Sequence, residues 1–571
     1  MEPAKVFRKD IIDLEGITPG FSHHGATGVV GGHGDSDGNS HLFVIPENRK
    51  LGVTSTTLLI VNRMIGTGIF STPSTIMQAT NSVGASLLFW VLGGFMTLWM
   101  SAYLELGTAL PRSGGEKVYL ERIYRKPKYL ATSIFAVEIV CFAHSAANCI
   151  NFSGYLLRVV HGLDPALSGN CGRSSNGQLK APSPLAEEWI NKGISMAAIT
   201  LVCLVHAFTP KFGIYMSNAL AFFKLIMLLL VVCTGFAALA GNLKAPRPDN
   251  FSTFDGAGVA CPDVHEDSSG RAADFSLALM QVLYSYSGWE NANYVLTEVR
   301  NAPETLKIAA PLANLTVTVL YILANIGYFA ASSKSEIASS GTTVAASFFT
   351  NVYGQGFFVT RILPFIISLS ILGNISSQTF AAARVKQEVA KEGILPFSKF
   401  FASDWPIQTP TGGLLLHWMF TVALIAGPQS SDAYPFISLL YTYCQSWVKL
   451  LIALGLLYLT LSPTSTWKAE RTSFHTSNFL TVTWALSLLF VLSAPFIKNN
   501  TITPTVPWFV VPTVGCSVVV IGTIYWAYWF KIWPLFGYNI EHHVEVLPDG
   551  SERVRYVHGR NTPATKSPLW W

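Results

Sequence analysis

The sequence predicts an all-α integral membrane protein with about twelve transmembrane helices, from its composition, its long apolar runs and the placement of its positive charges. Of its 571 residues, 50% are hydrophobic and only 12% are charged, whereas a soluble domain carries about 25% charged residues. A helix needs about 20 apolar residues to cross a bilayer. Twelve such runs lie at 53–79, 83–108, 131–158, 189–209, 213–240, 274–297, 309–331, 357–383, 410–427, 433–460, 477–497 and 506–530.

The positive charges predict the orientation of these spans. When the N-terminus is placed in the cytosol, the inside segments hold 25 Lys and Arg residues and the outside loops hold 7. Cytoplasmic loops of membrane proteins collect Lys and Arg. We therefore expect both termini in the cytosol. The net charge of +5 then reflects membrane topology and does not indicate a nucleic-acid partner.

The predicted spans divide the chain into a core, two further helices and two tails. Segment 16–42 is rich in Gly, Ser and His and has too few large apolar groups to fold. Its histidines are irregularly spaced, which does not favour a metal site. The predicted regions are a disordered cytosolic N-tail at 1–50, a ten-helix core at 51–460 with repeats at about 51–240 and 274–460, two peripheral helices at 477–531, and a cytosolic C-tail at 532–571.

Catalytic and cofactor-binding patterns are missing from the sequence. It has no Gly-rich nucleotide loop of the Walker A type. No arrangement of side chains indicates covalent catalysis or a metal cluster. We therefore expect neither an enzyme nor a bound cofactor or metal.

Two predicted spans carry small residues at mid-length. The first reads LLIVNRMIGTGIFSTPSTI, with Gly66-Thr67-Gly68 near its middle, and the sixth reads FSLALMQVLYSYSGWENANYVLTEV, with 285–288 near its middle. Gly and Ser are weak helix formers, although small residues also serve packing between membrane helices. Interruptions five spans apart are typical of an inverted five-plus-five repeat with a site at the bilayer midplane.

Broken helices leave backbone groups unpaired, and in a membrane such groups are tolerated where they line a cavity. The half-helix that starts near 68–70 would direct free N–H groups and a positive dipole end at an anion. Carbonyl groups at 65–66 and 286–287 would accept from an ammonium group. A zwitterionic amino acid offers a carboxylate and an ammonium close together, so the pattern favours that class of ligand.

Four segments carry a resemblance to a known family. They read NRMIGTGIF from Asn62, YLELGTALPRSGGEKVYLERIYRKPKYL from Tyr103, YSYSGWENANYVLTEVRNAPETLKIA from Tyr284, and SSQTFAAARVKQEVAKEGILPFSKFFAS from Ser376. In this order they resemble the amino acid–polyamine–organocation superfamily and its L-type amino acid transporter branch, with fungal methionine permeases as the nearest likeness. The resemblance covers residues from about 50 to 535.

This resemblance implies a LeuT-like fold of ten core helices plus two peripheral ones. It also implies import of amino acids, methionine first, across a fungal plasma membrane by alternating access. Trp289 falls where relatives place a bulky residue near the gate and the side-chain pocket. The resemblance implies that the backbone of the substrate binds at Ile65, Gly66, Thr67, Gly68, Ile69, Tyr286, Ser287 and Gly288.

Ionisable residues inside the spans are candidates for coupling and gating. Lys224 matches a span 5 lysine whose ammonium replaces a sodium ion in sodium-independent relatives; it would bridge span 5 to the break in span 1, or else extend to the membrane surface. Arg63 would close a gate by pairing with an acid such as Glu290 or Glu298, or would instead extend to the membrane surface. Glu290 stands where methionine permeases of this likeness carry a small polar residue.

Fungal permeases of this likeness resemble proton symporters, but no residue in the sequence identifies a proton carrier. Glu138 and His144 in span 3 are candidates for a proton relay and equally for satisfied interior groups. The tail lysines Lys5, Lys9 and Lys50 are possible attachment sites for ubiquitin through ligase adaptors, or ordinary topological charge.

Cys171 and Cys261 each lie in a long outside loop, and a disulfide between them is left open because both face an oxidising space. The N-glycosylation sequons at Asn250 and Asn499 also lie in outside loops. Whether they carry glycans is left open. One alternative function is an exchanger joined by a disulfide at Cys171 to a single-span glycoprotein, since relatives are tethered in that loop. Another is a nutrient receptor of the same fold.

Overall fold

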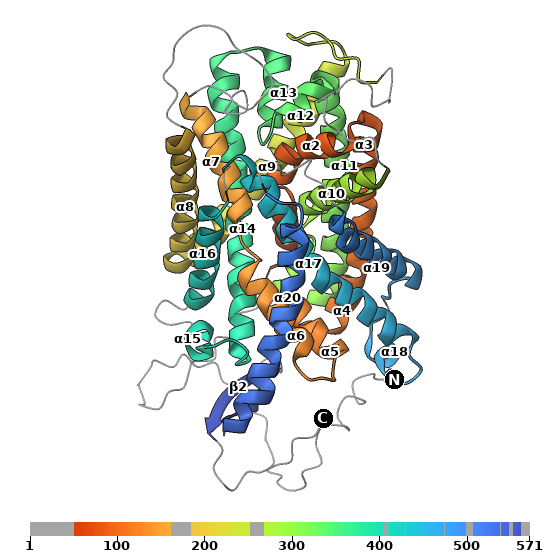
Figure 1. The fold of residues 1–571 in the computed structure, drawn as a ribbon, viewed down its shortest axis with the longest axis vertical. Coiled ribbons are helices and arrows are strands. Elements are labelled where there is room, and N and C mark those ends of the chain that lie inside the picture. Colours follow the sequence, from red (N-terminus) through yellow and green to blue (C-terminus); the bar gives the residue numbers. More distant parts are fainter. Residues whose placement is uncertain are drawn as a thin grey trace, which may run out of the picture. The chain divides into compact units, whose positions relative to one another are not determined.

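The described chain is a bundle of long helices with short helices at both of its ends (Figure 1). In the computed structural model, the described residues are 51–161, 184–251, 268–403, 409–428, 430–472, 474–497, 506–536, 538–546 and 552–560.

The first five predicted spans all contain helices. Spans 1 and 3 are interrupted, and span 2 continues through a 3-10 turn at Thr97–Trp99. The five spans are formed by α1 (Val53–Met64) with α2 (Thr67–Thr80), α3 (Val83–Met96) with α4 (Met100–Ala109), α6 (Leu130–Cys141) with α7 (Ala146–His161), α8 (Pro184–Phe208), and α9 (Pro210–Leu239). A short helix, α5 (Glu116–Ile123), connects the second span to the third.

The other seven predicted spans also contain helices. They are formed by α10 (Ser268–Tyr286) with the 3-10 helix η5 (Asn291–Glu298), α11 (Ala302–Ala331), α14 (Leu363–Lys391), α16 (Thr411–Ala426), α17 (Ser430–Leu461), α19 (Asn478–Ser493) and α20 (Val510–Ala527). The shorter helices between them are α12 (Lys334–Ser339), α13 (Val344–Tyr353), α15 (Ser398–Ala402) and α18 (Trp467–Glu470).

Length and hydropathy support a membrane location. Ten helical segments of the described chain are long and apolar enough to cross a bilayer. The two remaining predicted spans are the sixth, which is divided between α10 and η5, and the ninth, in which α16 has 16 residues. The predicted class of multi-span helical membrane protein is confirmed.

Local sequence explains where several helices begin. Proline has a fixed φ and lacks an N–H, which suits the first turn of a helix. Pro210, Pro303 and Pro364 occupy that position in α9, α11 and α14. Ser333 begins α12 with a capping box, in which Glu336 reciprocates the hydrogen bond.

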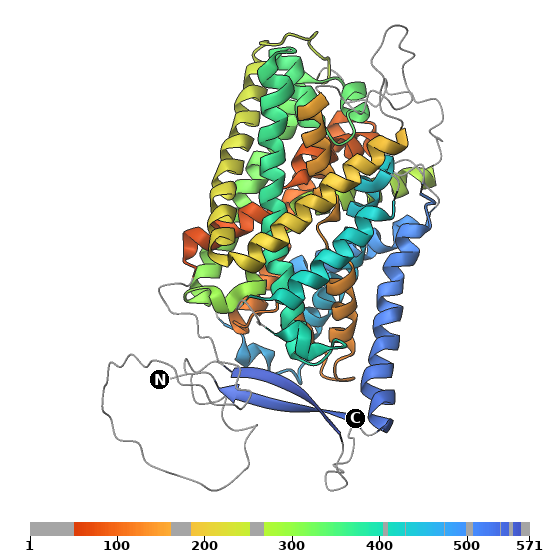
Figure 2. The same ribbon diagram turned by 90° about the vertical axis from the view of Figure 1, so that its left-hand side faces the viewer.

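Two features differ from the prediction of an all-α chain with unbroken spans elsewhere. The third span, predicted as continuous over 131–158, is interrupted at 142–145 between α6 and α7. The region after α20 contains an antiparallel hairpin of β1 (Tyr538–Val546) and β2 (Glu552–Arg560), which the sequence analysis did not predict. Figure 2 shows the two strands in dark blue.

The two halves of span 1 pack against different helices. α1 lies mainly against α11 and α9, whereas α2 lies mainly against α10 and α12. α9 and α11 are in backbone contact, because a Cβ on Gly235 would lie 2.5 Å from the Cα of Gly327. The helices that support α1 are thus themselves closely joined.

One end of the bundle, here called the α1 end, brings together the start of α1 and the end of η5. The N–H of Leu51 donates to the carbonyl of Glu298 over 2.7 Å, and the N–H of Arg300 donates to the carbonyl of Leu51 over 2.9 Å. The carboxylate of Glu298 also pairs with Arg384 near the end of α14, at 2.5 Å. The α1 end therefore contains the exits of spans 6 and 8.

Candidate functional site

The first span breaks at the predicted place. α1 ends at Met64, Ile65 is extended with φ −74° and ψ 98°, and Gly66 has φ −136° and ψ −145° before α2 begins at Thr67. None of the described side chains caps the first turn of α2, which contains Thr67, Gly68 and Ile69. Such a turn presents unpaired N–H groups and the positive end of the helix dipole.

The sixth span breaks beside the first. α10 ends at Tyr286, and Gly288 has φ +114°, a conformation that side chains with a Cβ rarely adopt. A Cβ on Gly68 would lie 2.6 Å from the Cα of Ser285, and one on Gly288 would lie 2.4 Å from Cγ of Arg63. Glycine is therefore required where the two broken segments meet. The contacts join Gly68 to Ser285 and Gly288 to Arg63.

Lys224 on α9 bridges span 5 to the broken part of span 1. Its side chain is 0% exposed. Its Nζ donates to the carbonyl oxygens of Asn62 and Ile65, at 2.8 and 2.7 Å. The bridging position predicted for Lys224 is observed, and the alternative in which it extends to the membrane surface is wrong. The carbonyl of Ile65, which was expected to accept from a ligand ammonium, already accepts from this lysine.

A cluster of hydroxyl and amide side chains joins four spans at the breaks. The hydroxyl of Thr67 donates to Oδ1 of Asn148 at 2.8 Å and lies 3.3 Å from the hydroxyl of Tyr284. The amide of Asn148 donates to Asn374 at 2.9 Å and to Gln378 at 2.8 Å. Spans 1, 3, 6 and 8 thus meet through side chains that can also bond a small polar ligand.

Nothing in the sequence singled out Asn148, Asn374 or Gln378. Uncharged amides are modest signals in an apolar helix, because they also serve as interhelical hydrogen bonds. Asn374 is placed by the backbone, since its amide donates to the carbonyl of Arg63 at 2.6 Å. The signal that could have found these three residues is an amide side chain within a predicted span that packs against a predicted break.

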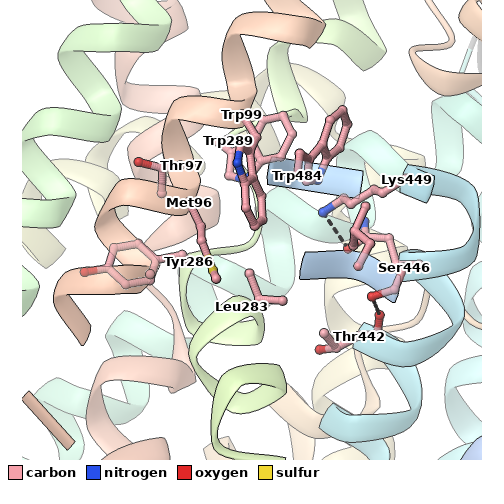
Figure 3. Close-up of a pocket in the computed structure, with 13 residues that line it drawn as sticks. Met96, Thr97, Trp99, Leu283, Tyr286, Trp289, Thr442, Ser446, Lys449 and Trp484 are labelled. Atoms are coloured by element: carbon pink, nitrogen blue, oxygen red, sulfur yellow. Dashed lines mark hydrogen bonds between the residues drawn. The ribbon is translucent and has the colours of Figure 1, made fainter. Parts of the chain in front are cut away.

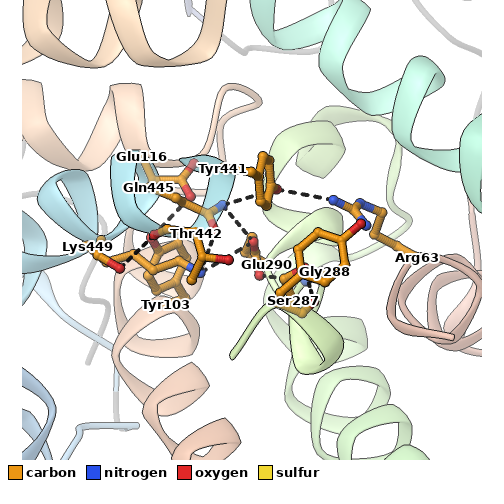
Figure 4. A network of polar contacts seen from close by, with 12 residues as sticks. Arg63, Tyr103, Glu116, Ser287, Gly288, Glu290, Tyr441, Thr442, Gln445 and Lys449 are labelled. Atoms are coloured by element: carbon orange, nitrogen blue, oxygen red, sulfur yellow. Dashed lines mark hydrogen bonds and ion pairs between the residues drawn. The ribbon is translucent and has the colours of Figure 1, made fainter. Parts of the chain in front are cut away.

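Glu290 and Lys449 form a buried ion pair on the α1 side of the break in span 6 (Figure 4). The carboxylate of Glu290 is 2% exposed and lies 3.6 Å from Nζ of Lys449. It also accepts from the amide of Gln445 at 3.1 Å and from the N–H of Gly288 at 3.1 Å. Lys449, which the sequence analysis left unassigned, is the cation nearest this carboxylate.

Arg63 does not pair with the acids proposed for it. Its guanidinium donates to the hydroxyl of Tyr441 at 3.1 Å. Glu298 pairs instead with Arg384, and Glu290 pairs with Lys449. Because Arg63 is buried beside Gly288, it does not extend to the membrane surface either. The prediction that Arg63 lies at the break is correct, and its predicted partner is wrong.

A pocket opens beside this network, with a cavity volume of about 30 Å³. We call it the acidic pocket, because Glu116, Glu138 and Glu290 all line it. Arg63 and Gln378 also contribute to its wall. The acidic pocket therefore connects the break in span 6 with the amide cluster.

A second small pocket lies between spans 2, 6, 10 and 11 (Figure 3). It is lined by apolar and aromatic side chains, among them Met96, Leu283 and Trp484. Trp289 faces it with Lys449 above the indole, 5.0 Å from the ring centroid, and packs edge-on against Tyr103. Trp289 thus points away from the break in span 1, and the structure does not place it in the amide cluster.

Tyr286 also faces away from the amide cluster. Its hydroxyl donates to the carbonyl of Trp90 on α3 at 3.1 Å, and its ring lines the pocket of Figure 3. The neighbouring Ser287 donates to the carbonyl of Tyr284 at 2.8 Å. Near this break, span 1 is therefore contacted by backbone atoms and by the side chains of Tyr284 and Ser285.

Two of the segments that carry the family resemblance meet at the α1 end, around residues 114–117 and 392–393. Lys117 of α5 forms a buried ion pair with Glu392, directly after α14, and lies 3.4 Å from Glu121. Glu116 beside it accepts from the hydroxyls of Tyr103 and Tyr294, each at 3.0 Å. Helix α5 is thereby fastened both to span 8 and to η5.

The pKa of Glu116, which lies outside the membrane spans, is raised to about 7. Burial is the main cause, and the negative charge of Glu290 adds to it. One carboxylate oxygen of Glu116, Oε2, has no hydrogen-bond partner among the described residues. The site therefore contains a carboxyl that changes charge near neutral pH.

Several predicted features fall outside the described residues, and one sequon can be judged. Cys171, Cys261, Asn499 and the tail lysines 5, 9 and 50 belong to the undescribed part of the chain. Asn250 is 3% exposed, and its amide donates to the carbonyls of Phe329 and Ser332, each at 2.7 Å. Because glycosylation replaces one of the two N–H groups that make these bonds and needs an accessible amide, this sequon is unsuited to use in the folded state. Within the described ranges, no group of three His, Cys, Asp or Glu side chains is placed to hold a metal ion.

A helical membrane bundle whose first and sixth spans break against each other is the architecture of a LeuT-like carrier. The chain belongs to the amino acid permease family, whose model matches residues 51–522. It is 32% identical to the high-affinity methionine permease of Saccharomyces cerevisiae, over 89% of this chain and 84% of that protein. It is 27% identical to the low-affinity methionine permease of the same yeast, over 91% of this chain and 88% of that protein. It is 28% identical to the Asc-type amino acid transporter 1 of Mus musculus, over 61% of this chain and 59% of that protein.

Proposed function

We propose that this permease imports neutral amino acids, with methionine as the principal substrate, across the plasma membrane by alternating access coupled to protons. The observation that carries the proposal is the contact between the breaks of spans 1 and 6 at Gly68 and Ser285. It places the uncapped first turn of α2 next to a cluster of amide and hydroxyl groups.

The chemistry of this site suits a zwitterion. The substrate carboxylate would accept from the N–H groups of Thr67, Gly68 and Ile69, where the helix dipole favours an anion. The ammonium would donate to side-chain oxygens of the amide cluster, such as those of Asn148 and Gln378, since Lys224 occupies the carbonyl of Ile65. This assignment revises the sequence-based expectation, which gave the ammonium to the carbonyl groups at 65–66 and 286–287.

Two relatives support methionine as the substrate. Both are named methionine permeases, and each is matched over more than four fifths of its length. A thioether side chain is apolar and polarisable and makes favourable contacts with aromatic rings. The rings of Tyr284, Tyr434 and Tyr441 lie edge to face beside the amide cluster and supply such a surface.

The direction of transport follows from charge. The α1 end carries the Lys-rich and Arg-rich segments, so we place it in the cytosol together with both termini. The acidic pocket then belongs to the inward-facing path. Inward movement of one proton is worth about 2.3 kcal/mol per 100 mV, which supports more than tenfold accumulation of a neutral substrate.

Uptake of radiolabelled methionine in permease-deficient yeast tests this function. Cells that express the chain should take up methionine faster at pH 4.5 than at pH 7.5, and unlabelled neutral amino acids should compete. Absence of uptake from protein that reaches the cell surface would contradict the proposal. Methionine binding without net uptake would favour the receptor alternative.

The exchanger alternative has its own test. A partner linked by a disulfide would add a large mass in electrophoresis without reductant, and reductant would remove it. We expect the chain to migrate alone in both conditions. A reducible shift that a Cys171→Ser variant abolishes would establish the heteromeric exchanger.

A further inference from the structure

The break in span 3 holds two buried nitrogen bases that the proposed transport path does not use. Lys386 comes from α14 and His417 from α16, and each is 0% exposed. Nζ of Lys386 lies 3.1 Å from the carbonyl of Ala143 and 3.3 Å from Nδ1 of His417. Nε2 of His417 lies 3.0 Å from the hydroxyl of Ser145. Both bases therefore contact the unwound residues between α6 and α7.

The hydrogen bonds of this pair fit one excess proton. In one form the ammonium of Lys386 donates to the Ala143 carbonyl and to Nδ1, while Nε2–H donates to Ser145. In the other form a doubly protonated His417 donates through Nδ1 to a neutral lysine amine. Two buried positive charges whose nitrogen atoms lie 3.3 Å apart would repel strongly, so we expect the two bases to titrate as one unit.

The surroundings do not neutralise this charge permanently. Glu138 and Cys141 face Lys386 from α6, and Cys203 faces it from α8. His144 faces His417 from the break itself, and Arg63 acts on it from α1. Within the described residues no carboxylate lies within ion-pair distance of Lys386. A buried ammonium without a salt bridge is held less firmly than a paired one.

We propose that the Lys386–His417 pair is the proton-binding site of the permease, holding one proton that it releases to water in the acidic pocket. Release leaves a neutral amine and a neutral imidazole, so the unit changes its charge by one. Ala143, whose carbonyl accepts from Lys386, lines the acidic pocket together with Glu138. The proton therefore has a short path to a cavity at the proposed cytosolic side.

The pair is connected to the substrate site through the same break. Gln378 donates to the carbonyl of His144 at 2.7 Å and accepts from Asn148 at 2.8 Å. Asn148 in turn accepts from Thr67 at the start of α2. Loss of the proton weakens the bond to the Ala143 carbonyl and releases the turn at 142–145. The movement of this turn is transmitted to Asn148. Protonation of the Lys386–His417 pair thereby controls the proposed substrate site.

The inference rests on the proposed transport of methionine, and two assays separate the two claims. In the first assay, liposomes that contain the full-length protein are loaded with unlabelled methionine. Entry of labelled methionine is then measured with equal pH on both sides, which requires exchange but no proton gradient. Net accumulation is then driven by a gradient of one pH unit, with the membrane potential held at zero by potassium and valinomycin. One proton per substrate supports at most about tenfold accumulation.

The variants replace the proton site and keep its hydrogen bonds. His417→Gln removes the base that shares the proton with Lys386, and Lys386→Arg carries a guanidinium that does not release its proton. Each should exchange methionine within about twofold of the wild type and lose accumulation. His206→Gln is the matched control, because His206 is also buried and bonded to a serine, Ser376, at 3.0 Å. It should keep both activities.

Each outcome decides the inference. Accumulation by His417→Gln at the wild-type level overturns it. Loss of exchange together with accumulation in both His417→Gln and Lys386→Arg also overturns it, since the pair would then be structural. Exchange without gradient-driven accumulation in the wild type overturns the proton site but leaves methionine transport intact. No exchange by the wild type overturns the proposed function itself.

Discussion

The ammonium of Lys224 lies 2.7 Å from the carbonyl oxygen of Ile65, so α9 supplies the donor that the last turn of α1 lacks. The carbonyl of Asn62 receives a second bond from the same group at 2.8 Å. A positive charge at this place also meets the negative end of the α1 dipole. One side chain thus stabilises the end of the half-helix next to the proposed substrate site.

Replacement of Lys224 by Ala should reduce methionine uptake at least tenfold. A buried carbonyl that loses its donor costs about 1–3 kcal/mol. Here the carbonyls of Asn62 and Ile65 would lose their short bonds to the ammonium and keep only the long contacts of the Asn374 amide, at 3.4 and 3.5 Å. Uptake of labelled methionine, normalised to protein at the cell surface, measures the effect. Lys307→Ala is the control, because Lys307 makes only a partly exposed pair with Glu304 on α11. Equal uptake by Lys224→Ala and Lys307→Ala would show that the bridge is dispensable.

A methyl group at Gly68 should abolish uptake while the protein still reaches the surface. The added Cβ would lie 2.6 Å from the Cα of Ser285, and backbone cannot move aside as a side chain can. The two breaks would be forced apart. Gly154→Ala on α7 is a matched control, because the nearest atom to its Cβ is 3.8 Å away. Wild-type uptake by Gly68→Ala would show that close contact of the breaks is unnecessary.

The Glu290–Lys449 pair should show strong energetic coupling. Lys449→Met leaves a buried carboxylate without its cation, and Glu290→Gln in the same chain removes that charge again. A double-mutant cycle on thermal unfolding in detergent should give a coupling of about 1–3 kcal/mol. The exposed pair Glu304–Lys307 should give about 0–1 kcal/mol. Equal coupling in the two cycles would mean that Glu290 and Lys449 do not depend on each other.

Glu116 should make the stability of the permease depend on pH. Its pKa in the folded protein is raised to about 7 by burial and by Glu290, so the fold favours the protonated carboxyl. This contribution is fully present below the ordinary pKa of about 4.3 and is lost as the pH rises through 7. The unfolding temperature should therefore fall between about pH 5 and pH 7.

Glu116→Gln should flatten that pH dependence, because the amide cannot ionise. The control Glu304→Gln, in an exposed part of α11, should keep the wild-type slope. Unfolding temperatures measured at several pH values in one detergent would decide between these outcomes. A slope that survives in Glu116→Gln would assign the titration to another group.

The two breaks could be predicted because each depends on residue types within one short segment. Gly66, Gly68 and Gly288 relax the local preference for helix, and their repetition five spans apart indicated the architecture. The break in span 3 gave no such signal, since its segment FAVEIVCFAHSAAN contains neither Gly nor Pro. Its carbonyls are instead held by Lys386 and Gln378, which are far away in the sequence.

Charged partners were harder to predict than charged positions. Lys224 contacts the break in span 1 as predicted. Arg63 and Glu290 also lie at the breaks, but their partners Tyr441 and Lys449 both come from α17, whose packing the sequence does not reveal. Lys386 was counted as a loop charge after a span that ended at 383, whereas α14 continues to Lys391 and carries it into the bundle. An apolar run in the sequence ends where the first charged residue appears. It therefore underestimates the length of a helix that buries a charged residue.

The different supports of α1 and α2 assign a mechanical role to Gly66. Lys224 and Tyr321 hold α1 to the joined pair α9 and α11, since the hydroxyl of Tyr321 donates to the carbonyl of Met64 at 2.8 Å. Thr72 holds α2 to Ser285 on α10 at 2.7 Å. If these two groups of helices rock past one another, the torsion angles at 65–66 form the pivot. The chain is then continuous across a mobile joint, and the substrate would sit on its axis.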